Sequence, residues 1–262
     1  MMNAVWLQNA AYIWVPFILI ATLGAWFGMN NIRGVRATFQ EQTGIFQRKH
    51  AWLLAWLYTG TFGSFIGFSA AFPFLLSSQF PAMGAYKYAF IGPVLGALIR
   101  PFGGWLADRI GGARVTFWNF ALMLAAAVTA LIALPSGPDS GQFSLFFGAF
   151  MVLFIAAGIG NGSVFRMVPT VFMTLHERLA VGKDQAAQEQ AVRDGEIETS
   201  VALGFTAAVA ALGLFFIPAI VAISIGATGL PQTAMVVFGI FYASCLLVTW
   251  RCYFCKKADI CC

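Results

Sequence analysis

Long apolar stretches recur along the whole chain, separated by short polar segments. Each stretch has about 20 residues, the length that an α-helix needs to cross the roughly 30 Å hydrocarbon core of a membrane. None shows the alternating apolar and polar residues of a barrel strand. Inside lipid the backbone N–H and C=O groups must bond to one another, and a helix is the only other structure that achieves this. We therefore predict seven transmembrane helices, at residues 10–29, 52–77, 86–106, 115–134, 143–175, 200–225 and 232–250.

The composition agrees with an integral membrane protein. Hydrophobic residues make up 60% of the chain and charged residues 10%, against roughly 25% charged residues in ordinary soluble domains. The net charge of +5 requires no nucleic-acid partner, because the cations gather in the first, third and fifth loops and in the tail. Loops with an excess of lysine and arginine face the cytoplasm. We predict a multi-pass protein of the cell inner membrane, with the amino terminus outside and the carboxyl terminus in the cytoplasm.

One arginine lies deep within an apolar stretch. Arg100 is about 12 Å from the polar Asp108-Arg109 end of its helix at 1.5 Å per residue, too far for easy snorkelling. All ten acidic residues fall in loops, in the tail or at helix ends, so no buried carboxylate is expected beside it. A buried guanidinium without an acid is suited to a planar oxyanion, which it binds through two parallel hydrogen bonds. The alternative is an arginine that binds backbone carbonyls or bridges helices.

The preceding stretch supplies aromatic residues at a similar depth. Tyr58 and Phe62 are four residues apart and therefore share a helix face. A phenol can donate a hydrogen bond to an anion, and the faces of aromatic rings can pack against a flat ion and exclude water from it. We expect both residues to line a substrate site with Arg100.

A second intramembrane arginine, Arg166, follows a glycine-rich segment that also carries Asn161 and Ser163. Glycines loosen a helix, and the nearby Pro169 removes a backbone donor. These residues are candidates for a gate or a second anion contact. The alternative is that Arg166 lies at the membrane interface.

Several motifs resemble one known family. The segment "GGWLADRIGGAR" is similar to the loop motif of the major facilitator superfamily, and "YTGTFGSFIGFSAAFPFL", "GALIRPFGG", "GNGSVFRMVP" and "ALGFTAAVAALGLFFIP" resemble, in that order, the nitrate/nitrite porters of that superfamily. The loop motif, which such transporters use in conformational change, is carried here by Gly104, Asp108, Arg109, Gly111 and Arg114.

The resemblance covers only the second, carboxyl-terminal half of a porter. It implies an all-α fold, with a six-helix half-bundle at residues 51–262 preceded by one extra helix and a cytoplasmic linker at residues 1–50. It also places Arg100, Tyr58 and Phe62 in the substrate site. The family's glycine-rich signature helix falls at residues 203–214, where Gly204 and Gly213 keep the pattern and the alanine and leucine at 210 and 214 depart from it.

The implied function is transport of nitrate and nitrite, which we expect to be exchange, since neither histidine lies inside a predicted span. Half a transporter leaves its site open, so a first-half chain or a second copy is the expected partner, besides the lipid bilayer. The alternatives are proton-coupled nitrate uptake and a truncated, non-transporting membrane scaffold. We predict no enzyme activity, cofactor or metal site, because the chain has no nucleotide-binding loop or catalytic triad. Because no second cysteine pair stands at the spacing of a zinc site, the Cys252-Cys255 pair is weak evidence for a metal site.

The fifth loop, at residues 176–200, mixes charges of both signs with alanine and glutamine. This pattern is typical of a solvated helix. We predict a surface helix that covers the cytoplasmic face.

Overall fold

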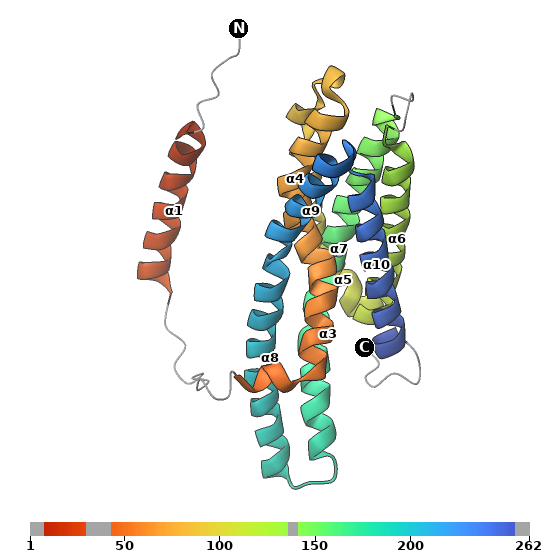
Figure 1. The fold of residues 1–262 in the computed structure, drawn as a ribbon. Coiled ribbons are helices and arrows are strands. Elements are labelled where there is room, and N and C mark those ends of the chain that lie inside the picture. Colours follow the sequence, from red (N-terminus) through yellow and green to blue (C-terminus); the bar gives the residue numbers. More distant parts are fainter. Residues whose placement is uncertain (1–7, 30–42, 136–140, 255–262) are drawn as a thin grey trace. The chain divides into compact units, whose positions relative to one another are not determined.

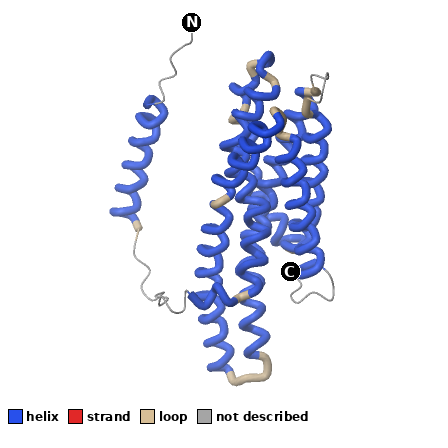
Figure 2. The backbone as a smooth tube through the Cα atoms, viewed as in Figure 1, coloured by secondary structure: helices blue, strands red, loops and turns tan. Residues whose placement is uncertain are grey.

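The computed structural model describes residues 8–29, 43–135 and 141–254, and these are almost entirely helical (Figure 2). The chain divides into two compact units, Met1–Ala37 and Thr38–Cys262. The first contains helix α1 (Gln8–Gly28), whose segment Trp14–Gly28 is apolar. The functional division that we place at residue 50 stays a prediction.

The second unit is a bundle of long helices, drawn in Figure 1. Its first span is continuous through α3 (Lys49–Tyr58), the π-helical turn η2 (Thr59–Gly63) and α4 (Ser64–Gln79). The other helices are α5 (Ile91–Ile110), α6 (Gly112–Ala133), α7 (Phe143–Ala180), α8 (Gln185–Ala211), α9 (Gly213–Thr228) and α10 (Gln232–Thr249). Short turns complete it: η1 (Gly44–Gln47), η3 (Pro81–Met83), η4 (Ala85–Tyr88) and η5 (Trp250–Phe254).

The described residues form six helices that are long and apolar enough to cross a membrane, in addition to the shorter apolar segment of α1. They run over Lys49–Gln79, Ala85–Ile110, Gly112–Ala133, Phe143–Ala180, Gln185–Thr228 and Gln232–Phe254. Each contains or closely overlaps one predicted span. The prediction of an all-α membrane protein is therefore confirmed.

The predicted surface helix at residues 176–200 is wrong as a separate element. Helix α7 continues to Ala180 and α8 begins at Gln185, so the two form a hairpin at one end of the bundle (Figure 1). Gly182 allows the tight turn with a φ of 78°, and the Asp184 carboxylate caps α8 by accepting from the backbone N–H of Ala187 at 3.4 Å. Alanine, glutamine and glutamate are good helix formers, and here they extend the membrane helices instead of building a new one.

Small residues bring α5 and α7 into backbone contact. A Cβ atom added at Gly103 would overlap the backbone of Ile159, and one added at Gly158 would overlap the carbonyl of Gly96. A Cβ atom at Gly162 would meet the Arg100 carbonyl. Glycines at such spacing let membrane helices approach closely. The contact fixes the backbone of Arg100 against the middle of α7.

A second close contact joins the first span to the break between α8 and α9. A Cβ atom at Gly213 would lie 2.5 Å from the Cα and oxygen atoms of Gly63, in the π-helical turn. Both helices therefore depart from regular α-geometry where they touch. Pi-helical turns are often found at functional sites, and this one lies between Tyr58 and Ser64.

Candidate anion-binding site

Arg100 lies in the middle of α5, nine residues after Ile91 and ten before Ile110. At 1.5 Å per residue, it is about 14 Å from either end of the helix. Its side chain is half-buried, and its Nη2 atom donates a hydrogen bond to the Tyr58 hydroxyl at 3.3 Å. The structure therefore brings together two of the residues that the sequence predicts to share a site.

The third predicted residue completes an aromatic wall. The rings of Tyr58 and Phe62 are stacked, with centroids 5.3 Å apart and an interplanar angle of 18°. The guanidinium carbon of Arg100 is 5.8 Å from the centroid of the Phe62 ring, within the range of a cation–π contact. Tyr58 is buried, whereas Phe62 is half-buried. Arg100, Tyr58 and Phe62 thus form a cage in which Tyr58 is buried while Arg100 and Phe62 stay partly exposed.

A further aromatic residue, absent from the predicted site, lies beside this cage. Phe165 of α7 lies with its ring centroid 6.3 Å from that of Tyr58 and is 41% exposed. Its position in the family-like segment "GNGSVFRMVP", next to Arg166, was the available signal. The contact could not be inferred, because 107 positions separate residues 58 and 165.

No carboxylate neutralises Arg100 within the described part of the chain. Ion pairs in that part of the chain include Arg48 with Glu198, His176 with Glu198 and Arg166 with Asp108. Since the phenol oxygen of Tyr58 accepts from Arg100, the phenol proton is free to donate elsewhere. The site therefore offers a guanidinium fork and a hydroxyl donor to an anion, next to a flat aromatic face.

Arg166 is placed differently from Arg100. Its Nε atom donates to the Asp108 carboxylate at 2.6 Å, and both side chains are about half exposed. They lie beside a hollow of about 420 Å³ that Gly112 and Met173 also line. The charge of Arg166 is therefore balanced in this structure. Its role as a gate or second anion contact stays a prediction.

Ser163 and Asn161 are both buried in α7. The Ser163 hydroxyl bonds to the Thr116 hydroxyl at 2.9 Å and donates to the Gly160 carbonyl at 3.2 Å. It thus contributes to the packing of α6 on α7. By contrast, the side-chain oxygen of Asn161 has no hydrogen-bond partner among the described residues.

The loop motif spans the junction of α5 and α6. Gly111 adopts a φ of 94°, which an L side chain rarely adopts, and so permits the sharp break between the helices. The guanidinium of Arg109 lies over the Trp105 ring, 4.4 Å from its centroid. Arg114 is exposed, and a Cβ atom at Gly104 would have no neighbour closer than 3.9 Å. The motif's role in conformational change stays a prediction.

The glycines of the predicted signature helix have different surroundings. Gly213 packs against the backbone of Gly63, while a Cβ atom at Gly204 would meet open space. Of the two departures from the family pattern, Ala210 is buried with its carbonyl oxygen facing Gly63, and Leu214 is 54% exposed. Only the second part of the signature therefore forms the close contact with the first span.

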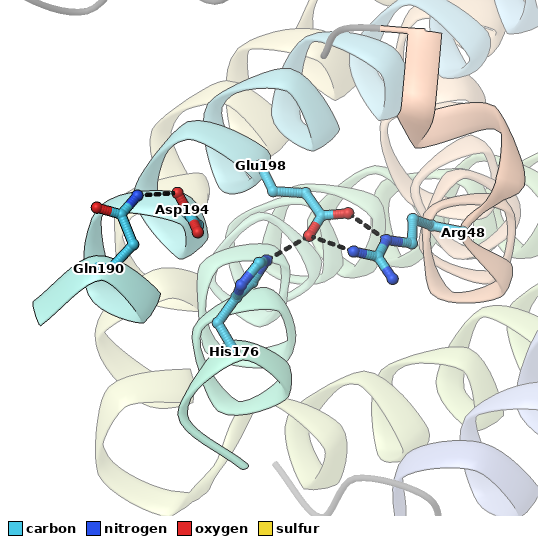
Figure 3. A network of polar contacts seen from close by, with 5 residues as sticks. All are labelled: Arg48, His176, Gln190, Asp194 and Glu198. Atoms are coloured by element: carbon cyan, nitrogen blue, oxygen red, sulfur yellow. Dashed lines mark hydrogen bonds and ion pairs between the residues drawn. The ribbon is translucent and has the colours of Figure 1, made fainter. Parts of the chain in front are cut away.

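A network of charges ties three helical segments together near the α7–α8 hairpin. The Glu198 carboxylate of α8 lies between Arg48, which precedes α3, and His176 of α7 (Figure 3). It accepts from Arg48 Nε at 2.5 Å, and its other oxygen is 2.5 Å from His176 Nε2. Figure 3 also shows the Gln190–Asp194 contact on the same helix. The network anchors the start of the span that carries Tyr58.

Replacing Glu198 with glutamine should lower the thermal stability slightly. Arg48 is 49% exposed, so solvent screening limits the pair to about 1 kcal/mol or less. For a protein of this size, that corresponds to a shift of about 2–4 °C in Tm. Thermal unfolding in detergent measures the shift. Glu189→Gln, at an exposed carboxylate of the same helix, is the control, and equal shifts in the two variants would contradict a stabilising role for the network.

The fold and the site together define a multi-pass, all-α membrane protein. Near the middle of its bundle lie stacked aromatic rings and an arginine that has no carboxylate partner among the described residues. No protein-family model matches the chain. The chain is 46% identical, over 94% of its length, to "Nitrate/nitrite transporter NarU" of Salmonella typhimurium, and 36% identical, over 97% of its length, to "Probable nitrate/nitrite antiporter NarK2" of Thermus thermophilus. It is also 29% identical to the "Nitrite extrusion protein" of Bacillus subtilis, over 94% of its length.

These similarities confirm the resemblance to the nitrate/nitrite porters that the sequence motifs indicated. The relatives carry the names of transporters rather than enzymes. The alignments cover 53% of the first two relatives and 55% of the third, so the chain spans about half the length of the curated relatives it matches. This coverage is consistent with the carboxyl-terminal half of such a porter.

Proposed function

We propose that this chain binds nitrate and nitrite at Arg100 and serves as one half of a nitrate/nitrite exchanger. The observation that carries the proposal is the guanidinium of Arg100, which lies mid-helix without a carboxylate partner among the described residues and against Tyr58 and Phe62. An intramembrane charge marks a functional site by default. A planar oxyanion supplies the missing negative charge in a shape that fits both the guanidinium fork and the aromatic face.

The names of the relatives support the choice of anion, because they specify nitrate and nitrite. Since the chain spans about half of each, a second half is needed to cover the partly exposed Arg100 and Phe62. Major facilitator transporters bind their substrates between two halves near the middle of the membrane. We propose that the complementary half is part of the same polypeptide, a separate polypeptide, or a second copy of this chain.

Exchange is the mode of transport that fits the site best. Swapping nitrate for nitrite moves equal charges in opposite directions and requires no titrating side chain. Among the described acidic and histidine side chains, Asp108 binds Arg166, Glu198 binds His176 and His50 contacts the Tyr253 hydroxyl. Exchange therefore needs only the anion donors of the cage.

We propose the orientation that the loop cations indicate, in the inner membrane with the amino terminus outside and residue 262 in the cytoplasm. In that orientation the α7–α8 hairpin and its charge network face the cytoplasm. A reporter fused after residue 262 tests this in intact cells. Activity of a periplasm-dependent reporter at that position would contradict the orientation.

Uptake of labelled nitrate into vesicles tests the function directly. One set of nitrite-loaded vesicles contains this chain alone, and a second contains it together with the amino-terminal half of the Salmonella typhimurium relative. We expect uptake with the second set that depends on internal nitrite. Uptake that instead follows a proton gradient would favour proton-coupled transport, and no uptake by either set would favour a non-transporting scaffold.

A further inference from the structure

The aromatic wall of the cage is built on a π-helical turn. Tyr58 is the last residue of α3, and Phe62 lies inside η2. Their stacked rings, with centroids 5.3 Å apart, therefore lie on either side of the point where the first span changes from α- to π-helical geometry. Single π-helical turns are rare and are often found at functional sites. The interactions that hold this turn in place therefore bear on the shape of the cage.

Two threonine hydroxyls bond to the backbone at this junction. The Thr61 hydroxyl donates to the carbonyl oxygens of Leu57 and Tyr58, at 3.4 Å and 3.3 Å. One turn earlier, the Thr59 hydroxyl donates to the carbonyl of Ala55 at 2.8 Å. A threonine that bonds back to a carbonyl three or four residues earlier competes with the backbone N–H groups and often bends the helix. The bonds of Thr61 reach the last two residues of α3, which is where the regular α-helix ends.

The side chain of Thr61 packs against α7 and is bound to the backbone of its own span. It is 0% exposed. Its Cγ2 methyl group occupies the space beside Gly160 of α7, where an added Cβ atom would lie only 2.5 Å from it. Its single hydroxyl proton is shared between the two carbonyls of α3. Thr61 therefore acts on the cage through the backbone of Tyr58.

Other helices hold the remainder of the turn. A Cβ atom added at Gly60 would lie 2.7 Å from the Phe120 ring of α6 and 2.9 Å from the Cys245 sulfur of α10. Immediately after the turn, the Ser64 hydroxyl accepts from the Tyr242 hydroxyl of α10 at 2.9 Å. The turn cannot move as a unit without disturbing these contacts. A change in its internal hydrogen bonds is therefore relieved at its start, beside the stacked rings.

We propose that Thr61 is a positioning residue of the anion site, because its hydroxyl fixes the junction of α3 with η2 and thereby holds Tyr58 against Phe62 and Arg100. This inference rests on the proposed function. The contacts are continuous, since Thr61 bonds to the carbonyl of Tyr58 and the phenol of Tyr58 accepts from Arg100 at 3.3 Å. Without the hydroxyl, residue 58 shifts. Both the ring stacking and the hydrogen bond that orients the guanidinium then weaken.

The experiment measures nitrate binding by the protein assembled with the amino-terminal half used in the transport assay. Thr61→Val keeps the β-branched shape and removes the hydroxyl, whereas Thr61→Ser keeps the hydroxyl. Thr61→Ala differs from the serine variant only in lacking the hydroxyl, and it supplies the test if valine disturbs the contact with α7. The matched control is Thr249→Val, at a threonine of α10 that is also 0% exposed and bonds to the Cys245 carbonyl at 2.8 Å.

Titration calorimetry with potassium nitrate, carried out well below the Tm of each variant, separates positioning from stability. We expect the valine and alanine variants at Thr61 to bind nitrate about three- to tenfold more weakly, the range that corresponds to one neutral hydrogen bond. The serine variant and Thr249→Val should bind nitrate as the unsubstituted protein does. The Tm of Thr249→Val should fall as much as that of Thr61→Val, because each loses one buried hydrogen bond.

Three results would overturn the inference and leave the proposed function standing. They are unchanged nitrate affinity in both hydroxyl-free Thr61 variants, a loss in the serine variant equal to that in the alanine variant, or an equal loss in Thr249→Val. Absence of nitrate binding by the unsubstituted protein would overturn the proposed function and the inference together.

Discussion

Replacing Arg100 with lysine should weaken nitrate binding about tenfold or more while leaving insertion and helix packing intact. Lysine keeps the positive charge but replaces the planar fork by a single ammonium group, so two parallel hydrogen bonds to the anion cannot form. A hydrogen bond to a charged group contributes roughly 1.5 to 3 kcal/mol, and 1.4 kcal/mol corresponds to a tenfold change in affinity.

The structure adds a second reason for a large effect. Arg100 holds the Tyr58 hydroxyl at 3.3 Å and lies over the Phe62 ring. A lysine Nζ atom cannot keep both contacts and also reach an anion in the same place, because its donors radiate from one point. The substitution therefore changes both the arginine and the aromatic wall that it organises.

Nitrate titration of the assembled protein measures the effect. Arg251→Lys, the same exchange at an exposed arginine of η5, is the control for general effects of the substitution. The yield of folded protein should match that of the unsubstituted chain in both variants. Unchanged nitrate affinity in Arg100→Lys would mean that this arginine is structural, and the site would have to be withdrawn.

Replacing Gly103 with alanine should destabilise the bundle by about 1–3 kcal/mol, the cost of overpacking a close-packed interior. The added methyl group would overlap the backbone of Ile159, and backbone cannot move aside as the end of a flexible side chain can. Helices α5 and α7 would have to separate. Since Arg100 is one turn away on the same face, its position against α7 should shift as well.

The adjacent glycine provides a matched control. A methyl group at Gly104 would have no neighbour closer than 3.9 Å, so Gly104→Ala should keep Tm unchanged or raise it slightly through the better helix propensity of alanine. Thermal unfolding of the two variants in the same detergent makes the comparison. If both alanines lowered Tm equally, the close approach of α5 and α7 at Gly103 would not be the cause.

The candidate site could be predicted in part because depth along a helix can be counted from sequence. Each residue advances a helix by about 1.5 Å, which placed Arg100, Tyr58 and Phe62 at a similar level before any contact was known. Sequence could not show that Phe165 joins them or that Arg166 is paired with Asp108. Those contacts join different helices, and their existence depends on how the helices are rotated about their axes.

The helical fold and the membrane spans were determined by the sequence itself, since the apolar stretches are long enough to cross a bilayer and lipid allows only hydrogen-bonded backbone. The tertiary structure decided three other features: the extension of α7 and α8 into one hairpin, the contact of α5 with α7 through glycines such as Gly103, and the unpartnered oxygen of Asn161. The physical reason is the same in each case. Hydropathy specifies which residues leave water. Inside lipid, however, all faces of a helix are similarly apolar, so the close packing of particular backbones selects which helix faces meet.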